Sequence, residues 1–107
     1  MAAEHVIVTS TTDSEAAAGE LAARVVDERL GACAQIAGPI TSVYRWEGAV
    51  RTDREWRVEI KTTADRVPAL TERIGQLHGY DVPEVIATPI VGGSAAYLAW
   101  LTAETRG

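Results

Sequence analysis

The stretch "EWRVEIKTT" at Glu55–Thr63 alternates strictly between apolar and polar side chains. An extended chain places Trp56, Val58 and Ile60 on one face and Glu55, Arg57, Glu59 and Lys61 on the other. Such alternation is typical of a strand that packs on a hydrophobic core with one face and contacts solvent with the other. The stretch therefore predicts a sheet that is covered on one side.

The segment before this strand predicts a hairpin partner for it. "ACAQIAGPITSVYRWEG", residues 32–48, is strand-like over an unusual length. Gly38–Pro39 interrupts it, and proline inside a strand indicates a bulge or a sheet edge. With a loop expected at residues 47–53, the two segments form a long β-hairpin.

Strand and helix patterns alternate on both sides of this hairpin. We expect a strand at His5–Thr12, a helix capped by Asp13 or Ser14 and ended by Gly31, a helix capped near Asp65 and ended by Gly79, a strand at residues 84–91 and a last helix at Ser94–Glu104. The order β-α-β-β-α-β with an extra C-terminal helix predicts the α+β class and a ferredoxin-like antiparallel sheet.

The strand that begins near Ala34 lies at an edge of this predicted sheet. A long edge strand exposes unpaired backbone groups unless another element covers it. Tyr44 and Trp46 lie on this strand and add exposed aromatic surface. We therefore expect self-association, with sheet edges pairing between subunits.

Length and charge limit the number of domains, the partners and the cellular location that we expect for this protein. The 107 residues fit a single domain over 1–107, large enough to fold without a metal or a disulfide. A net charge of −5 argues against nucleic acid as a partner. No stretch approaches membrane-spanning length or resembles a signal peptide. The lone Cys33 fits a reducing compartment, so the expected location is the cytoplasm, away from membranes.

The turn "LHGYDVPEVIA", Leu77–Ala87, collects polar groups around a glycine and a proline. Gly79 and Pro83 account for the turn itself. Glu84 is less easily explained, because a carboxylate beside a buried strand requires hydrogen-bond donors or a cation. Lys61 is expected nearby in the sheet, where it would pair with Glu84 or line a pocket with it.

Four stretches together resemble the CutA family, the divalent-ion tolerance proteins: "GACAQIAGPITSVYRWEG", "EWRVEIKT", "HGYDVPEVIATPI" and "YLAWL". The resemblance covers nearly the whole chain. It implies a ferredoxin-like fold, a tight homotrimer built by long hairpins, an architecture similar to PII signalling proteins, and a role in tolerance of copper and other divalent cations. Tyr44, Trp46 and Trp56 match aromatic positions of the hairpin and are expected at the trimer interface. Cys33, Lys61, His78, Tyr80, Pro83 and Glu84 also match family motifs.

Metal ligands are few in this chain. Borderline divalent ions bind thiolate, imidazole and carboxylate groups, and the candidates are Cys33, His78 and Glu84. No pair of strong ligands shares one element, so we expect an open, weak site for Cu²⁺ or another divalent cation, completed by a neighbouring subunit. Two of these ligands have a structural alternative: His78 complements a helix C-terminus, and Cys33 serves as a small apolar side chain.

The chain contains no sequence motif for a nucleotide-binding loop or a catalytic serine. Gly92–Gly93–Ser94 opens a helix and is explained by its turn alone. A Cys33–His78 nucleophile pair lacks a third orienting group. We therefore expect a non-enzymatic metal-tolerance trimer with Lys61, Tyr80 and Glu84 as ligand-binding candidates. The alternative is a PII-like signalling or scaffolding trimer that binds a small molecule or a partner protein in the same cleft.

Overall fold

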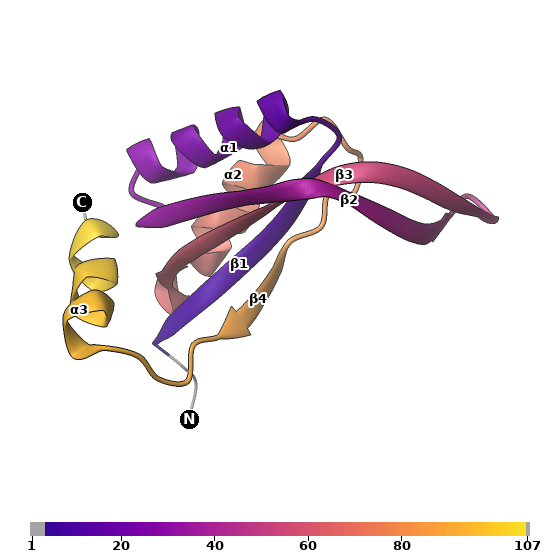
Figure 1. Cartoon of the computed structure of the whole chain (residues 1–107). Helices are drawn as coiled ribbons and strands as arrows, with labels where there is room; N and C mark the ends of the chain where they lie inside the picture. Colours follow the sequence, from indigo (N-terminus) through magenta and orange to yellow (C-terminus); the bar gives the residue numbers. More distant parts are fainter. Residues whose placement is uncertain (1–3, 107) are drawn as a thin grey trace.

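The computed structural model describes residues 4–106 as an antiparallel sheet with three helices (Figure 1). The elements are β1 (His5–Thr12), α1 (Glu15–Asp27), β2 (Cys33–Trp46), β3 (Ala49–Thr63), the 3-10 turn η1 (Ala64–Arg66), α2 (Val67–Leu77), β4 (Ile86–Pro89) and α3 (Ala95–Glu104). The four strands lie in the order β2-β3-β1-β4, and each neighbouring pair is antiparallel. The predicted α+β class and element order are confirmed.

Helices α1 and α2 cover one face of this sheet, while α3 stands apart at one end (Figure 1). The core between helices and sheet contains Val8, Val25, Val58, Ile60, Leu70 and Ile74, all fully buried. Val58 and Ile60 are the apolar positions of the alternating stretch, so its periodicity identified the core-facing side of β3. Burial of one such aliphatic side chain stabilises the fold by about 1.5–3 kcal/mol.

The C-terminal end of α1 differs from the prediction. The helix ends at Asp27, and Arg29, with φ of 59°, adopts the left-handed conformation expected of Gly31. Gly31 is required for a different reason. A Cβ at this position would lie 2.4 Å from Cγ2 of Ile60, so only glycine lets the chain pass β3 this closely.

The hairpin is longer than predicted. Its turn consists only of Glu47 and Gly48, whose φ angles of 49° and 77° fit a two-residue primed turn. Residues 49–53, expected in a loop, instead pair with β2. The predicted irregularity at Gly38–Pro39 is confirmed as a register shift between Ala37 and Ile40. Beyond this shift, residues 40–54 project from the body, and we call this segment the hairpin arm (Figure 1).

Strand β4 is shorter than residues 84–91, because it pairs with β1 only from Ile86 to Pro89. Glu84 therefore lies in the loop before β4. Asp65 does not cap α2 as predicted. Its carboxylate accepts hydrogen bonds from Thr63 and from Arg106 beyond α3, and so ties the C-terminal segment to η1.

Among residues 4–106, no helix has the length and apolar character needed to cross a membrane.

Candidate functional site

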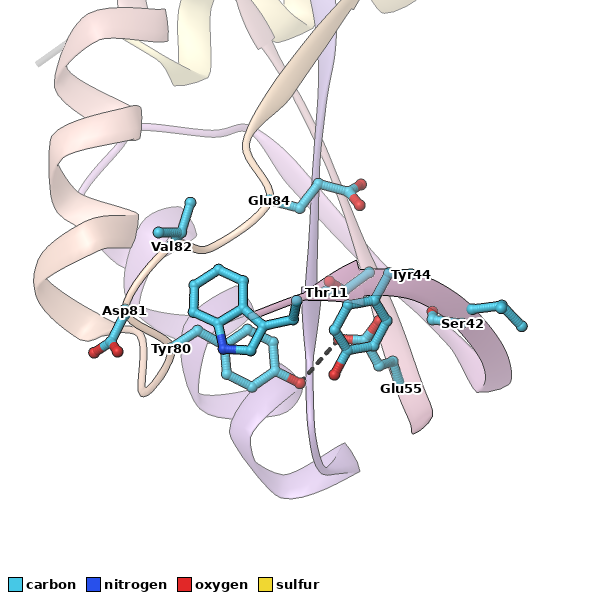
Figure 2. Close-up of a pocket in the computed structure, with 10 residues that line it drawn as sticks. Thr11, Ser42, Tyr44, Glu55, Tyr80, Asp81, Val82 and Glu84 are labelled. Carbon is cyan, nitrogen blue, oxygen red and sulfur yellow. Dashed lines mark hydrogen bonds between the residues drawn. The ribbon is translucent and has the colours of Figure 1, made fainter. Parts of the chain in front are cut away.

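A cleft of about 510 Å³ lies where the hairpin arm meets the body of the protein. Its walls come from β1, the arm and the turn that follows α2 (Figure 2). The lining residues are Thr11, Ser42, Val43, Tyr44, Trp46, Glu55, Tyr80, Asp81, Val82 and Glu84. The cleft thus joins two predicted ligand-binding residues, Tyr80 and Glu84, with two predicted interface residues, Tyr44 and Trp46.

Glu55 is the carboxylate at the base of the arm. Only 8% of its surface is exposed, although the alternation of β3 placed it on the polar face. The Tyr80 hydroxyl donates a hydrogen bond of 2.9 Å to its Oε2 (Figure 2). Burial, followed by this hydrogen bond to Glu55, raises the pKa of Tyr80 well above its usual value. Tyr80 therefore remains a protonated donor at neutral pH.

A second tyrosine-carboxylate pair lies on the arm. The Tyr44 hydroxyl donates a hydrogen bond to Asp53, which lies opposite Ser42 on the facing strand β3. This hydrogen bond, with a smaller contribution from desolvation, raises the pKa of Tyr44. Because each phenol is held by a carboxylate, the rings of Tyr44 and Tyr80 have defined positions around Glu55 (Figure 2).

His78 holds the turn that carries Tyr80. Its Nδ1 accepts a hydrogen bond of 3.0 Å from the Tyr80 backbone N–H, and its Nε2 donates one of 2.5 Å to the Thr11 carbonyl. These partners require the neutral ring with the proton on Nε2. Both nitrogens are thus occupied within the chain, and a metal ion would have to displace one of these bonds to bind His78.

The cleft is acidic. Glu55, Asp81 and Glu84 line it, and none of its lining residues is a lysine, an arginine or a histidine. Glu84 and Asp81 are exposed, and Figure 2 shows Asp81 directed away from Tyr44 and Glu55. The cleft offers oxygen atoms from carboxylates, phenols and the hydroxyls of Thr11 and Ser42, together with the indole N–H of Trp46.

Lys61 and Cys33 lie elsewhere on the sheet. They face each other across β3 and β2, and Lys61 is opposite Ile7 of β1. Four strand positions, about 13 Å, separate Ile7 from Thr11 at the cleft. The Lys61 ammonium lies 5.7 Å from the centre of the Tyr97 ring. The expected Lys61–Glu84 ion pair does not occur among residues 4–106, because the register places the two residues too far apart.

The three metal-ligand candidates do not converge within one chain. The described part of the chain contains no group of three or more histidine, cysteine, aspartate or glutamate side chains arranged to hold a metal ion. Cys33 lies along the sheet from the cleft, and His78 is occupied by backbone partners. Of the three, only Glu84 lines the cleft.

Trp56 differs from the other two hairpin aromatics. It packs against the protein's own core, and a Cβ on Gly38 would lie 2.7 Å from its ring. Trp56 is therefore partly buried inside the chain, whereas Tyr44 and Trp46 are 40% and 38% exposed.

Glu55 is the buried carboxylate of the cleft, and the sequence prediction missed it. The alternation of β3 assigned it to the solvent face, and nothing local marks it as buried. Its hydrogen-bond donor, Tyr80, is 25 residues away in sequence.

Comparison with known proteins gives consistent matches over nearly the whole chain. Residues 6–104 match the family described as CutA1 divalent ion tolerance protein. The divalent-cation tolerance protein CutA of Thermus thermophilus is 44% identical over 99 residues, which cover 92% of this chain and 96% of that protein. The chloroplastic CutA 1 of Oryza sativa is 46% identical over 94% of this chain, which spans only 57% of that relative.

Solved structures agree with these matches. The CutA1 crystal structure from Oryza sativa superposes with a TM-score of 0.94 at 45% identity, covering 98% of this chain and 96% of the other. The divalent cation tolerance protein from Thermus thermophilus superposes with a TM-score of 0.93 at 43% identity, covering 95% and 99% of the two chains.

Proposed function

Since this chain belongs to the CutA1 divalent ion tolerance family, we propose that it acts in divalent-cation tolerance as a homotrimer whose acidic cleft binds a cation weakly. The observation that carries this proposal is the set of three carboxylates in the cleft, Glu55, Asp81 and Glu84, without a basic lining residue. A neighbouring subunit would supply the ligands that one chain lacks. The role is non-enzymatic, and the single Cys33 fits a cytoplasmic location.

The sheet edges support a trimer. Strands β2 and β4 are the two edges of the sheet, and β2 continues into the hairpin arm. Pairing β2 of one subunit with β4 of the next is a head-to-tail contact, which forms a ring when its rotation closes. Val43 and Val50 on the arm are 66% and 64% exposed, as expected of a surface that another subunit covers. The sheet order β2-β3-β1-β4, with helices on one face, supports the ferredoxin-like assignment.

The chemistry of the cleft limits the choice of cation. Carboxylate, phenol and hydroxyl oxygens suit ions such as Mn²⁺ or Mg²⁺ better than soft ions, which prefer sulfur and nitrogen. Cu²⁺, the ion that the family resemblance suggests, would lack a free imidazole here because both His78 nitrogens are occupied. We therefore expect weak binding with a preference for oxygen-binding ions.

Calorimetric titration of the metal-free protein with Mn²⁺, Zn²⁺ and Cu²⁺ tests the metal role. We expect Glu84→Gln to lower the affinity about tenfold, because it removes one charged oxygen ligand from the cleft. Glu72→Gln on the exposed surface of α2 is the matched control. Binding that is absent, or equal in both variants, contradicts a metal site in this cleft.

A second candidate function has its own support. The cleft volume of about 510 Å³ falls within the range of small-molecule sites, and Val43, Tyr44, Trp46 and Val82 give it apolar walls. A PII-like signalling or scaffolding trimer would bind a small molecule or a partner protein here, without a metal role. Native mass spectrometry of the purified protein would detect a small molecule that copurifies, and its loss in Trp46→Leu would assign it to the cleft.

A further inference from the structure

The cleft combines aromatic walls with a buried carboxylate, and this combination indicates a class of ligand. We infer that the cleft accepts an organic cation, a quaternary or protonated alkylammonium group, between its aromatic side chains and Glu55. The inference rests on the proposed cleft and names the ligand class of the second candidate function. It differs from the metal proposal in the groups that bind the ligand.

The aromatic side chains are the first observation. Tyr44, Trp46 and Tyr80 are three of the six aromatic residues of the chain, and all three line this one cleft. The hydroxyls of Tyr44 and Tyr80 are held by Asp53 and Glu55, so the two rings keep their orientations. The electron-rich face of an aromatic ring attracts a cation, and tryptophan does so most strongly.

Glu55 is the second, independent observation. Its residue surface is 92% buried, taking the complement of its 8% exposure, and it lines the cleft. Oε2 accepts the hydrogen bond from Tyr80, whereas Oε1 has no hydrogen-bond partner among the described residues. No lysine, arginine or histidine in residues 4–106 forms an ion pair with it. Solvent reaches Oε1, since Ser10 Oγ is the one fully buried side-chain polar atom without a partner in the described residues. A cationic ligand would replace this solvent with an opposite charge.

Within one chain, the cleft suits an organic cation better than a bare metal ion. A metal ion needs several donors that converge at distances of 2.0–2.6 Å, roughly, and the described residues form no such group. A volume of about 510 Å³ accommodates an alkylammonium group with space for its substituents. One carboxylate and two or three ring faces are enough to bind such a group.

The test compares a cation with a neutral molecule of nearly the same shape. Tetramethylammonium and tert-butanol are each titrated into the purified protein, and backbone amide shifts at residues 42–46 and 80–84 report binding. We expect tetramethylammonium to bind about tenfold more tightly than tert-butanol. Trp46→Leu removes the π face and should weaken the binding of tetramethylammonium about tenfold, while Trp46→Phe retains most of it.

Glu55→Gln tests the carboxylate and should also weaken cation binding, with Glu59→Gln on the same strand as its matched control. Thermal denaturation identifies any variant that fails to fold, and light scattering identifies any variant that no longer assembles. Where a variant loses either property, the comparison of tetramethylammonium with tert-butanol on the unsubstituted protein decides. Equal binding of tetramethylammonium and tert-butanol would overturn the inference. Binding of Mn²⁺ without tetramethylammonium would overturn it and leave the metal proposal standing. Absence of both would overturn the inference and the proposed cleft together.

Discussion

Glu55 joins the arm to the body at the scale of single residues. The register shift at Ala37 and Ile40 sets Glu55 opposite Ile40, and Tyr80 covers its carboxylate from the turn after α2. His78 in turn fixes the backbone of Tyr80 through Nδ1. This chain of contacts links β1, β3 and the turn, and it gives the cleft a rigid wall.

Tyr80→Phe should destabilise the protein by about 1–2 kcal/mol, because it leaves a buried carboxylate without its donor. Urea denaturation measures the change in the free energy of unfolding. Tyr97→Phe is the control, since the Tyr97 hydroxyl has no hydrogen-bond partner in the described structure. A loss for Tyr80→Phe no greater than that of the control would show that the Tyr80–Glu55 bond contributes nothing measurable.

Two glycines should respond to alanine in opposite directions. Gly31→Ala places a Cβ 2.4 Å from Ile60 Cγ2 and should destabilise the fold by about 1–3 kcal/mol. Gly75→Ala, in helix α2 with no atom within 4 Å of the added Cβ, should stabilise it by about 0.5–1 kcal/mol. Thermal denaturation of both variants measures the difference. A Gly31→Ala variant as stable as wild type or more stable would contradict the close approach at Gly31, and a destabilised Gly75→Ala would contradict the open space at Gly75.

Single residues also show where sequence reasoning was limited. Gly31 was correctly identified as important, but for a turn that Arg29 makes instead. The reason is that Ile60, 29 positions later, approaches the backbone at Gly31, and no local pattern records such an approach. The burial of Glu55 was missed for the same reason.

At the scale of elements, helix α3 is attached to the body mainly through its C-terminal end. Arg106 donates hydrogen bonds to Asp65 and Thr63, and Arg66 donates one of 2.7 Å to the Thr105 carbonyl. Leu101 is its one fully buried apolar side chain, while Tyr97 and Trp100 are about 40% exposed. The polar contacts therefore determine where α3 lies on a single chain.

The Asp65–Arg106 pair should make stability depend on pH. The hydrogen bond from Arg106, and then that from Thr63, lower the pKa of Asp65. A lowered folded-state pKa contributes stability that is present above the unfolded value, near 3.8, and lost as the pH falls below it. Wild type should therefore exceed Asp65→Asn in Tm at pH 7, and this gap should begin to shrink below about pH 4 and continue to shrink as the pH falls further.

Asp27→Asn, an exposed aspartate of α1, is the control for this comparison. The gap should also narrow in high salt, because Asp65 and Arg106 are exposed to solvent. Equal Tm values for wild type and Asp65→Asn at pH 7, or a gap that stays constant as the pH falls from about 5 to 2, would rule out a stabilising role for the pair.

Most elements could be predicted from sequence because their signals are local. The alternation of Glu55–Thr63, the Ser14 cap and the Gly38–Pro39 interruption each lie within a few residues. Residues 49–53 were assigned to the loop that joins the two strands of the hairpin. Pairing with β2 determined their conformation instead, and pairing partners are not recorded in a local pattern.

At the scale of the whole molecule, several large apolar side chains are exposed on the arm and on strand β4. Val43 and Val50 are exposed on the hairpin arm, and Ile86 is 54% exposed on edge strand β4. Val43 and Ile86 lie on the two sheet edges that the proposed ring would join, and Val50 lies beside Val43 on the other strand of the arm. The interface was expected from the length of the edge strand.

Trp46→Ala should weaken the trimer by about 3–5 kcal/mol, because truncation of a large aromatic side chain in a packed contact removes its burial. Sedimentation velocity over a range of concentrations measures the dissociation. Arg45→Ala changes the neighbouring residue, whose side chain faces the opposite side of β2, and is the control. An unchanged dissociation profile for Trp46→Ala would place this side chain outside the interface.

The assembly itself is the claim on which the cleft proposal depends, and light scattering after size exclusion at micromolar concentration tests it most directly. The account predicts a single species at three times the chain mass of 11.4 kDa, about 34 kDa. A species at the mass of one chain would contradict head-to-tail pairing of β2 with β4 and the completion of the cleft by a neighbouring subunit.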